Sequence, residues 1–318
     1  MEAPDLRRVA LFIAVLAGFI TPFDLSAVVV ALPSIGAEFS MDAITLSWIS
    51  TAYLLAAGVF LVPFGRIADI YGRKKVFVAG LCLFIVSSFL MVFSVSSAMV
   101  ILLRVLQGSG AALIFGTSVA ILTEATPITE RGRALGIYTT AVYLGLSLGP
   151  FVGGFLTTQF GWRSIFLVNV PIGLFAITLI ALYLKGEWAD SRGERFDVGG
   201  AIQYGLTLVC VMYGFSLLPD REGFILIVAG SVMLGVFILR ELRISYPLLN
   251  MKLFRSNRVF MFSSLAALIN YTATFSITFF LSLYLQYIRG VPCKLCGNHP
   301  GHPAGRNGAL LPVGRASF

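Results

Sequence analysis

Apolar runs separated by short polar segments make up most of the chain between residues 9 and 288. A helix rises about 1.5 Å per residue, so about 20 apolar residues cross a hydrocarbon core of about 30 Å. Because the runs have about this length, the pattern predicts nine membrane-spanning helices. They lie at roughly 9–32, 46–64, 76–96, 98–122, 134–157, 163–184, 198–218, 224–240 and 259–288.

The polar segments between these runs divide the chain. Residues 185–197 are the most polar interruption and close a first group of six helices. After Gly290 the apolar pattern stops, and we interpret the last residues as an aberrant tail produced by a frameshift near Val291. The expected order is a six-helix bundle at 1–184, a cytoplasmic linker at 185–197, two extra membrane helices at 198–240, a second cytoplasmic linker at 241–258, one further helix at 259–289 and the tail at 290–318.

Composition agrees with a membrane protein. The 318 residues are 58% hydrophobic and 12% charged, and the mean hydropathy is +0.90. A soluble domain of this length could not bury so much apolar surface, so we expect an all-α polytopic protein in a lipid bilayer. The net charge of +8 would suggest a nucleic-acid partner in a soluble protein. Here the membrane orientation explains the charge, and we expect no nucleic-acid binding.

Lys and Arg are distributed unevenly between the two ends of the predicted helices. If the N-terminus lies inside, the inner segments up to residue 288 hold 16 of them, whereas the outer loops hold two, Arg163 and Arg221. Basic residues accumulate on the cytoplasmic side of membrane proteins. We therefore expect a multi-pass protein of the inner (cytoplasmic) membrane with a cytoplasmic N-terminus.

Two ionisable residues lie inside predicted helices, where a charge is costly unless it has a partner or a role. Asp24 and Arg104 fall at similar depths, so a pairing across a central cavity is geometrically feasible. Gln107 and Gly108 share the helical face of Arg104 and are candidates to line that cavity. The bland alternatives are a neutral Asp24 bonded to Thr21 or nearby backbone, and a packing Arg104 bonded to backbone carbonyls.

Glycines recur every four residues in the fifth predicted helix. Gly145, Gly149 and Gly153 form a smooth stripe, with Pro150 and Gly154 beside it. Small residues allow helices to approach closely, and a proline removes one helical hydrogen bond. The stripe fits a packing role and a gating role equally well.

The segment 65–75 is a charged, glycine-punctuated connection between the second and third predicted helices. Its candidate residues are Gly65, Asp69, Gly72 and Arg73. Asp69 lies four residues before Arg73, so it can cap a helix end or pair with a base. The bases alone could be orientation charges, but that account leaves Asp69 and the glycines unexplained.

We expect neither a metal site nor an enzyme. Cys293, Cys296, His299 and His302 have ligand chemistry, but they are packed more tightly than zinc sites of this kind allow. No nucleophile–base pair stands out in the sequence either.

These motifs together resemble the major facilitator superfamily and, within it, the 14-helix drug:proton antiporter family. Residues 65–75 match the signature between helices 2 and 3, residues 103–110 match the helix 4 motif tied to proton coupling, and residues 145–154 match the antiporter motif of helix 5. Residues 23–33 and 162–171 resemble motifs of helices 1 and 6 in the 14-helix branch. The chain departs from the pattern at Ile70, where a base is usual, and at Val29, where Asn is typical.

The resemblance implies two six-helix halves separated by two extra helices, so that residues 259–288 begin an incomplete second half. It implies export of hydrophobic, often cationic small molecules, driven by the proton gradient and without a cofactor. Asp24 and Arg104 would serve proton coupling, Gln107 and Gly108 the substrate cavity. The segment 65–75 would latch the inner gate and the glycine–proline helix would serve the conformational change.

Three alternatives stay open beside the exporter. The chain could be a metabolite symporter of the same superfamily, a non-transporting binding subunit of the membrane, or the inactive product of a truncated pseudogene. A periplasmic adaptor also stays open as a further partner.

Overall fold

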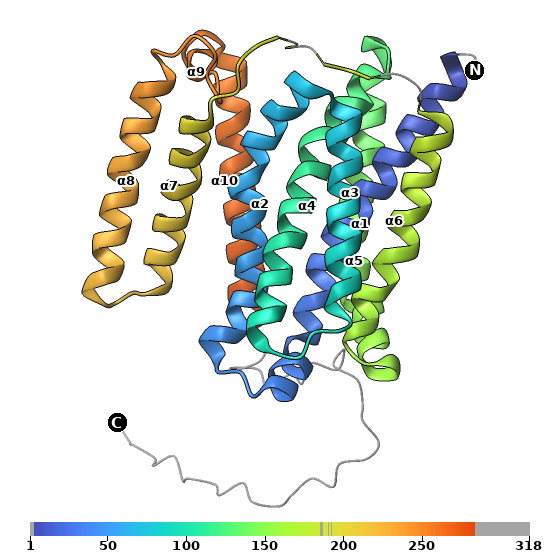
Figure 1. The fold of residues 1–318 in the computed structure, drawn as a ribbon, viewed down its shortest axis with the longest axis vertical. Helices are drawn as coiled ribbons and strands as arrows, with labels where there is room; N and C mark the ends of the chain where they lie inside the picture. The colour runs from blue at the N-terminus through green and yellow to red at the C-terminus, as the bar shows by residue number, and fades with distance from the viewer. Residues whose placement is uncertain (1–2, 185–186, 190, 192, 284–318) are drawn as a thin grey trace, which may run out of the picture.

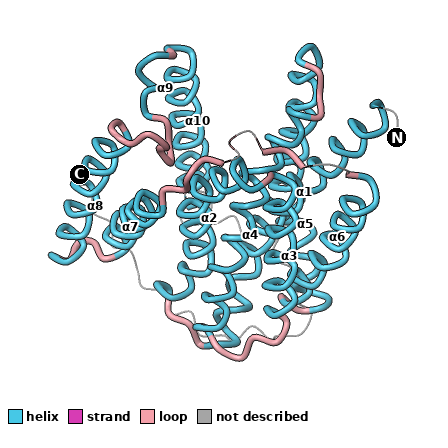
Figure 2. Tube along the Cα trace, turned by 45° about the horizontal axis from the view of Figure 1, so that its top comes forward, coloured by secondary structure: helices cyan, strands magenta, loops and turns pink. Residues whose placement is uncertain are grey.

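The computed structural model describes residues 3–184, 187–189, 191 and 193–283. Every regular element in this part of the chain is a helix, as Figure 2 shows. In chain order the elements are α1 (Ala3–Phe39), α2 (Ala43–Tyr71), α3 (Arg73–Met91), α4 (Ser97–Glu124), the 3₁₀ turn η1 (Ile128–Glu130), α5 (Arg131–Phe160), α6 (Arg163–Tyr183), α7 (Val198–Ser216), α8 (Arg221–Glu241), α9 (Met251–Ser256) and α10 (Arg258–Leu283).

Eight helices of the described part, α1 to α8, are long and apolar enough to cross a membrane. This confirms a multi-pass membrane protein and the first eight predicted spans. The ninth predicted span, 259–288, begins within α10, and its last residues lie outside the described part of the chain.

Most of these helices extend beyond the apolar runs that predict them. For example, α1 continues to Phe39 through Pro22 and Pro33. Asp42 then caps α2, because its Oδ1 accepts a hydrogen bond from Thr45 N at 3.3 Å. Helical hydrogen bonds do not depend on apolar side chains, so the helices continue through the polar residues that flank the apolar runs.

The connection at 65–75 is shorter than the sequence suggests. Its charged residues continue the helices, because α2 runs to Tyr71 and α3 begins at Arg73. Gly72 alone breaks the helical path, with φ of +118°, a conformation that residues with a side chain rarely adopt. The charged residues on both sides of Gly72 therefore lie on helical backbone.

The helices α1 to α6 pack into one bundle (Figure 1). The largest contact of α1 is with α5, while α4 lies between α2 and α3. The helix α6 closes the bundle by packing on α1 and α3. The largest fully buried apolar side chains of this bundle include Phe77, Phe84, Phe166, Ile20 and Ile114.

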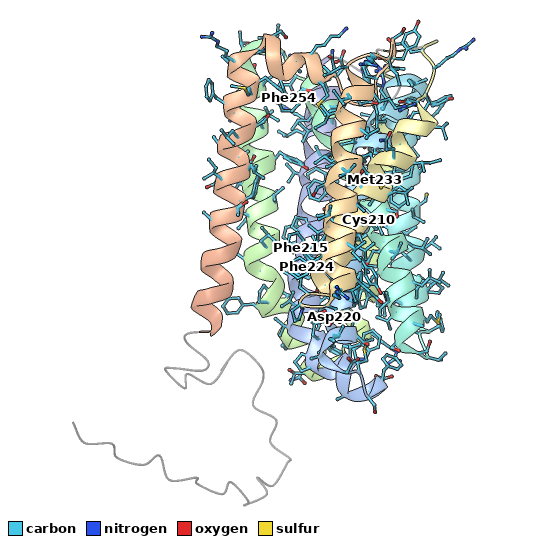
Figure 3. All side chains as sticks on the ribbon, turned by 90° about the vertical axis from the view of Figure 1, so that its left-hand side faces the viewer. Cys210, Phe215, Asp220, Phe224, Met233 and Phe254 are labelled. Atoms are coloured by element: carbon cyan, nitrogen blue, oxygen red, sulfur yellow. The ribbon has the colours of Figure 1, made fainter. Side chains whose placement is uncertain are left out.

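The helices α7 and α8 form a hairpin that reaches the bundle through α2 (Figures 1 and 3). Tyr204 of α7 donates a hydrogen bond from its hydroxyl to Gly58 O of α2 at 3.2 Å. In Figure 3, Asp220 lies at one end of the hairpin, and Phe254 of α9 lies near the opposite end of the molecule.

The connections sort onto two ends of the molecule. The N-terminal end of α1, the break between α2 and α3, and α9 lie at the upper end in Figure 1. The turns between α1 and α2 and between α7 and α8 lie at the lower end. Successive helices therefore alternate in direction, as the predicted topology requires.

Candidate functional site

Asp24 and Arg104 meet inside the bundle. Asp24 comes from α1 and Arg104 from α4, and Arg104 Nη1 donates to Asp24 Oδ2 at 2.7 Å. Both side chains are 0% exposed. The structure therefore brings together the two ionisable residues that the sequence places at similar depth.

In this structure helices of the first bundle enclose both side chains, so their place at a central cavity stays a prediction. Gln107 is also 0% exposed, and its role in a substrate cavity stays a prediction. Gly108 is buried against the backbone of Tyr53 in α2, where an added Cβ would collide with the Tyr53 carbonyl. These two residues serve the contacts of α4 with its neighbours among the described helices.

Asp24 receives hydrogen bonds from three side chains. Besides Arg104, Gln107 Nε2 donates to Asp24 Oδ1 at 3.1 Å, and Asn169 Nδ2 of α6 donates to the same oxygen at 2.6 Å. Side chains from α4 and α6 therefore converge on one carboxyl group of α1. In the structure the Thr21 hydroxyl donates to Ala17 O at 3.3 Å. The alternative of a neutral Asp24, bonded to Thr21 or to nearby backbone, stays a prediction.

Arg104 combines the pairing role with the packing role. Its Nη1 also donates to Gln107 Oε1 at 2.6 Å, and its Nε donates to Ile49 O of α2 at 3.1 Å. The guanidinium carbon lies 4.2 Å from the centre of the Tyr53 ring, which is a cation–π distance. Within the described part of the chain, Arg104 Nη2 is buried and has no hydrogen-bond partner.

Sequence reasoning did not select three members of this cluster: Ser88, Tyr53 and Asn169. Ser88 Oγ of α3 accepts a hydrogen bond from Gln107 Nε2 at 2.8 Å. Asn169 is completely buried, and its Oδ1 has no hydrogen-bond partner among the described residues. A lone amide within the apolar run 163–184 was the available signal, since a polar group buried in a membrane helix needs partners.

The glycine stripe of α5 lies against α1 on both sides of Asp24. A Cβ added to Gly145 would be 2.5 Å from Phe19 O, and one added to Gly153 would be 2.8 Å from Ala27 Cα. At Gly149 an added Cβ would come within 2.9 Å of Phe23 O. The stripe therefore makes a close helix contact.

The neighbours of the stripe, Pro150 and Gly154, are half-buried and buried, respectively. Pro150 lies inside α5, which continues unbroken from Arg131 to Phe160. The close packing against α1 is thus a structural fact, and a gating role for the stripe stays a prediction.

Asp69 and Arg73 pair across the break at Gly72. Arg73 Nη2 and Nε donate to Asp69 Oδ1 at 2.8 and 3.0 Å. Arg73 Nη1 also lies 3.6 Å from Glu124 Oε2, at the end of α4. The cluster thus ties α2, α3 and α4 together. At Gly65 the structure shows no need for a glycine, because an added Cβ would meet nothing within 4 Å among the described residues.

Three residues that precede α7 in the sequence, Glu187, Ser191 and Glu194, contact this part of the bundle. Glu187 Oε1 accepts a hydrogen bond from Lys74 N at 2.8 Å, where the first amides of α3 lack helical partners. Ser191 N donates to Asp69 O at 3.0 Å, and Glu194 pairs with Arg66. A cleft of about 580 Å³ opens beside Arg66 and Asp69, between α2 and the segment 245–250. The sequence separation of over 100 residues hid this contact from pattern analysis.

A second polar cluster lies at the opposite end of the bundle. Glu38 of α1 accepts hydrogen bonds from Arg163 of α6 at 2.8 and 2.6 Å and from Trp162 Nε1 at 2.7 Å. Arg163 Nε also donates to Val92 O at 3.0 Å. This cluster joins the ends of α1, α3 and α6. The sequence places Arg163 in an outer loop and within the motif at 162–171, but it does not indicate Glu38 as its partner.

The candidate metal ligands Cys293, Cys296, His299 and His302 lie outside the described residues. Within the described residues, no group of three or more His, Cys, Asp or Glu side chains could hold a metal ion. In the segment 23–33, Phe23 and Asp24 are buried, whereas Val29, where Asn is typical of the family, is 51% exposed.

Several known transporters are similar in sequence to this chain. The chain is 28% identical to the riboflavin transporter RibZ of Clostridioides difficile over 92% of its own length and 63% of that protein. It is 29% identical to the multidrug resistance protein Stp of Mycobacterium tuberculosis over 93% of its length and 58% of that protein. It is 34% identical to the cephamycin export protein CmcT of Amycolatopsis lactamdurans over 91% and 61%, respectively.

The chain spans about three-fifths of the length of these curated relatives. Its residues 14–312 match the family model described as Major Facilitator Superfamily. The described residues hold the first six-helix bundle, the α7–α8 pair and one helix of the second half. An all-α membrane fold with this match confirms the predicted fold class, and the chain belongs to the major facilitator superfamily.

Proposed function

We propose that the chain derives from a 14-helix drug:proton antiporter that exports hydrophobic, often cationic small molecules. The observation that carries this proposal is the fully buried pair of Asp24 and Arg104. A charge pair of this kind inside a membrane bundle is costly to build and is a default candidate for ion coupling. The names of several relatives, such as Stp and CmcT, describe drug resistance or export of an antibiotic.

Asp24 is the proposed proton carrier. A proton on Asp24 removes the negative charge that balances Arg104 inside the bundle. An unpaired buried charge is unfavourable by several kcal/mol, so protonation favours a rearrangement that opens the site. A proton moving down its gradient then supplies the bias between the inward-facing and outward-facing states.

The other predicted residues have supporting roles in this proposal. The pair of Asp69 and Arg73 latches the inner ends of α2 to α4 in one of the two states. The glycine contact of α5 with α1 lets one helix move against the other while staying close to Asp24. Transporters of this class bind substrate between two halves. Transport therefore requires a second half beyond the described helices, and the partners are substrate, protons, the bilayer and, where present, an adaptor.

Metabolite transport is the second candidate. It is favoured by the similarity to RibZ, whose name describes a riboflavin transporter. A non-transporting membrane protein is the third, and the assay below distinguishes it from the two transporters.

Everted membrane vesicles separate the three candidates. The chain, together with the second half that transport requires, is expressed in a host that lacks its own drug exporters, and the uptake of a cationic dye and the vesicle pH are followed together. Antiport predicts dye uptake with release of protons from the acidified lumen, and loss of both in Asp24→Asn. Co-movement of substrate and protons in one direction supports a symporter. If the protein is inserted in the membrane but neither dye nor protons move, the result supports a non-transporting protein.

A further inference from the structure

We infer that the side-chain amide of Asn169 rotates when Asp24 is protonated. In one orientation Asn169 donates a hydrogen bond to the ionised carboxylate, and in the other it accepts one from the neutral carboxyl group. Asn169 is then a positioning residue that joins α6 to the proton site. This inference rests on the proposed function, since it takes Asp24 as the group that binds the proton.

The two oxygens of Asp24 have different surroundings. Oδ2 faces Arg104 Nη1 at 2.7 Å, and a guanidinium has donors but no acceptor. A proton on Oδ2 would therefore point at another donor. Oδ1 faces the amides of Gln107 and Asn169, at 3.1 and 2.6 Å. An amide also carries an acceptor, so the proton belongs on Oδ1.

Gln107 cannot supply that acceptor. Its Oε1 already accepts from Arg104 Nη1 at 2.6 Å, and its Nε2 also donates to Ser88 Oγ at 2.8 Å. The Ser88 hydroxyl donates its own hydrogen to Phe84 O at 2.7 Å, so Ser88 can only accept from Gln107. Turning Gln107 would place an NH₂ group against Arg104 and a carbonyl oxygen against an acceptor. Both neighbours hold Gln107 in its present orientation.

Asn169 has the freedom that Gln107 lacks. Its Nδ2 donates to Asp24 Oδ1, while its Oδ1 is buried and has no hydrogen-bond partner in the described part of the chain. A half-turn about the Cβ–Cγ bond exchanges the two atoms. The bond that Nδ2 donates to Asp24 is then replaced by one that Oδ1 accepts, and Oδ1 gives up no partner among the described residues. After the turn, Asn169 Oδ1 accepts the hydrogen bond from protonated Asp24. The orphaned oxygen therefore gains a partner when the proton arrives.

Infrared difference spectroscopy tests this on the full chain in lipid vesicles, with asparagine carbonyls labelled by carbon-13. A change of pH shows the Asp24 carboxyl band, which Asp24→Asn removes, and any labelled amide band that responds. Asn169→Gln identifies the Asn169 band, because it keeps an amide and carries no label. Asn169→Leu serves the same purpose if the glutamine variant does not fold.

We expect the Asn169 amide band to shift with the same midpoint pH as the Asp24 band, and both difference bands to be lost in Asp24→Asn. A titrating Asp24 band with an unresponsive Asn169 band overturns the amide turn and leaves the proposed function standing. If no carboxyl band depends on Asp24, the residue takes up no proton. The proposed function then fails, and the inference fails with it.

Discussion

Gly145 of α5 and Phe19 of α1 touch through their backbones: a Cβ on Gly145 would lie 2.5 Å from Phe19 O. The contact is reinforced by Ser26, whose hydroxyl also lies 3.2 Å from Gly145 O. Backbone atoms cannot move aside as a flexible side chain can, so the two helices have no room for a methyl group here.

Gly145→Ala should therefore separate α1 from α5 and destabilise the bundle by about 1–3 kcal/mol. Thermal unfolding in detergent measures the loss. The matched control is Gly136→Ala in the same helix, where an added Cβ meets nothing within 4 Å among the described residues. The control should be neutral or slightly stabilising, because alanine favours a helix over glycine. Equal losses in both variants would contradict the close contact.

Asp24→Asn should abolish proton-coupled transport, and the structure adds a cost in stability. Asparagine keeps the shape of Asp24 but leaves the buried Arg104 without a counter-charge. Removing one partner of a buried pair typically costs about 3–5 kcal/mol. We expect the same order of loss in a denaturation experiment on Asp24→Asn.

A second substitution separates the charge effect from lost packing. In the double variant Asp24→Asn, Arg104→Gln, no unpaired charge remains, and much of the lost stability should return. A double variant that is less stable than both single variants would show that shape complementarity dominates over charge at this site.

Glu187→Ala should loosen the segment 187–194 from α3. Glu187 Oε1 accepts from Lys74 N at 2.8 Å, and an unpaired helix N-terminus costs about 1 kcal/mol. Limited trypsin digestion of vesicles should cut the linker 185–197 faster in the variant. Glu222→Ala, in the first turn of α8, is the control acidic residue at a helix start. An unchanged cutting rate in Glu187→Ala would show that the hydrogen bond from Lys74 N to Glu187 does not hold the linker against α3.

Asp197 should make the α7–α8 hairpin sensitive to acid. Burial raises the pKa of Asp197, but hydrogen bonds from Arg240, at 2.6 and 2.7 Å, and from Gly200 N outweigh it and hold the pKa below its usual value. A lowered pKa in the folded state means that the pair stabilises above the unfolded pKa of about 3.8 and that this contribution fades as the pH falls below it.

Asp197→Asn should therefore lower the free energy of unfolding by about 1.5–3 kcal/mol at pH 7 and progressively less below pH 4. Unfolding curves at pH 7 and below pH 4 measure the difference. Asp220→Asn at the other end of the hairpin is the control, because Asp220 makes no capping hydrogen bond with its side chain in the described part of the chain. A loss that is the same at both pH values would exclude the ionised form of Asp197 as its source.

The helices themselves can be predicted from the sequence. A bilayer core offers no water to unpaired backbone groups, so each apolar run of sufficient length must become a helix that satisfies its own hydrogen bonds. That requirement is local, and the eight runs from 9 to 240 match α1 to α8. A charged side chain is costly in the same environment, so an ionisable residue inside an apolar run is a candidate for a role. This criterion identified Asp24 and Arg104, and both are buried.

The partners of these residues are set only by the tertiary structure. Asn169 reaches Asp24 across 145 positions, and Glu187 reaches Lys74 across 113. The apolar pattern sets which face of a helix avoids water, but lipid and protein are both apolar, so it does not say which helix lies beside which. The sequence alone thus determined the helices and the two charges, while the packing of α1, α4 and α6 decided their hydrogen bonds.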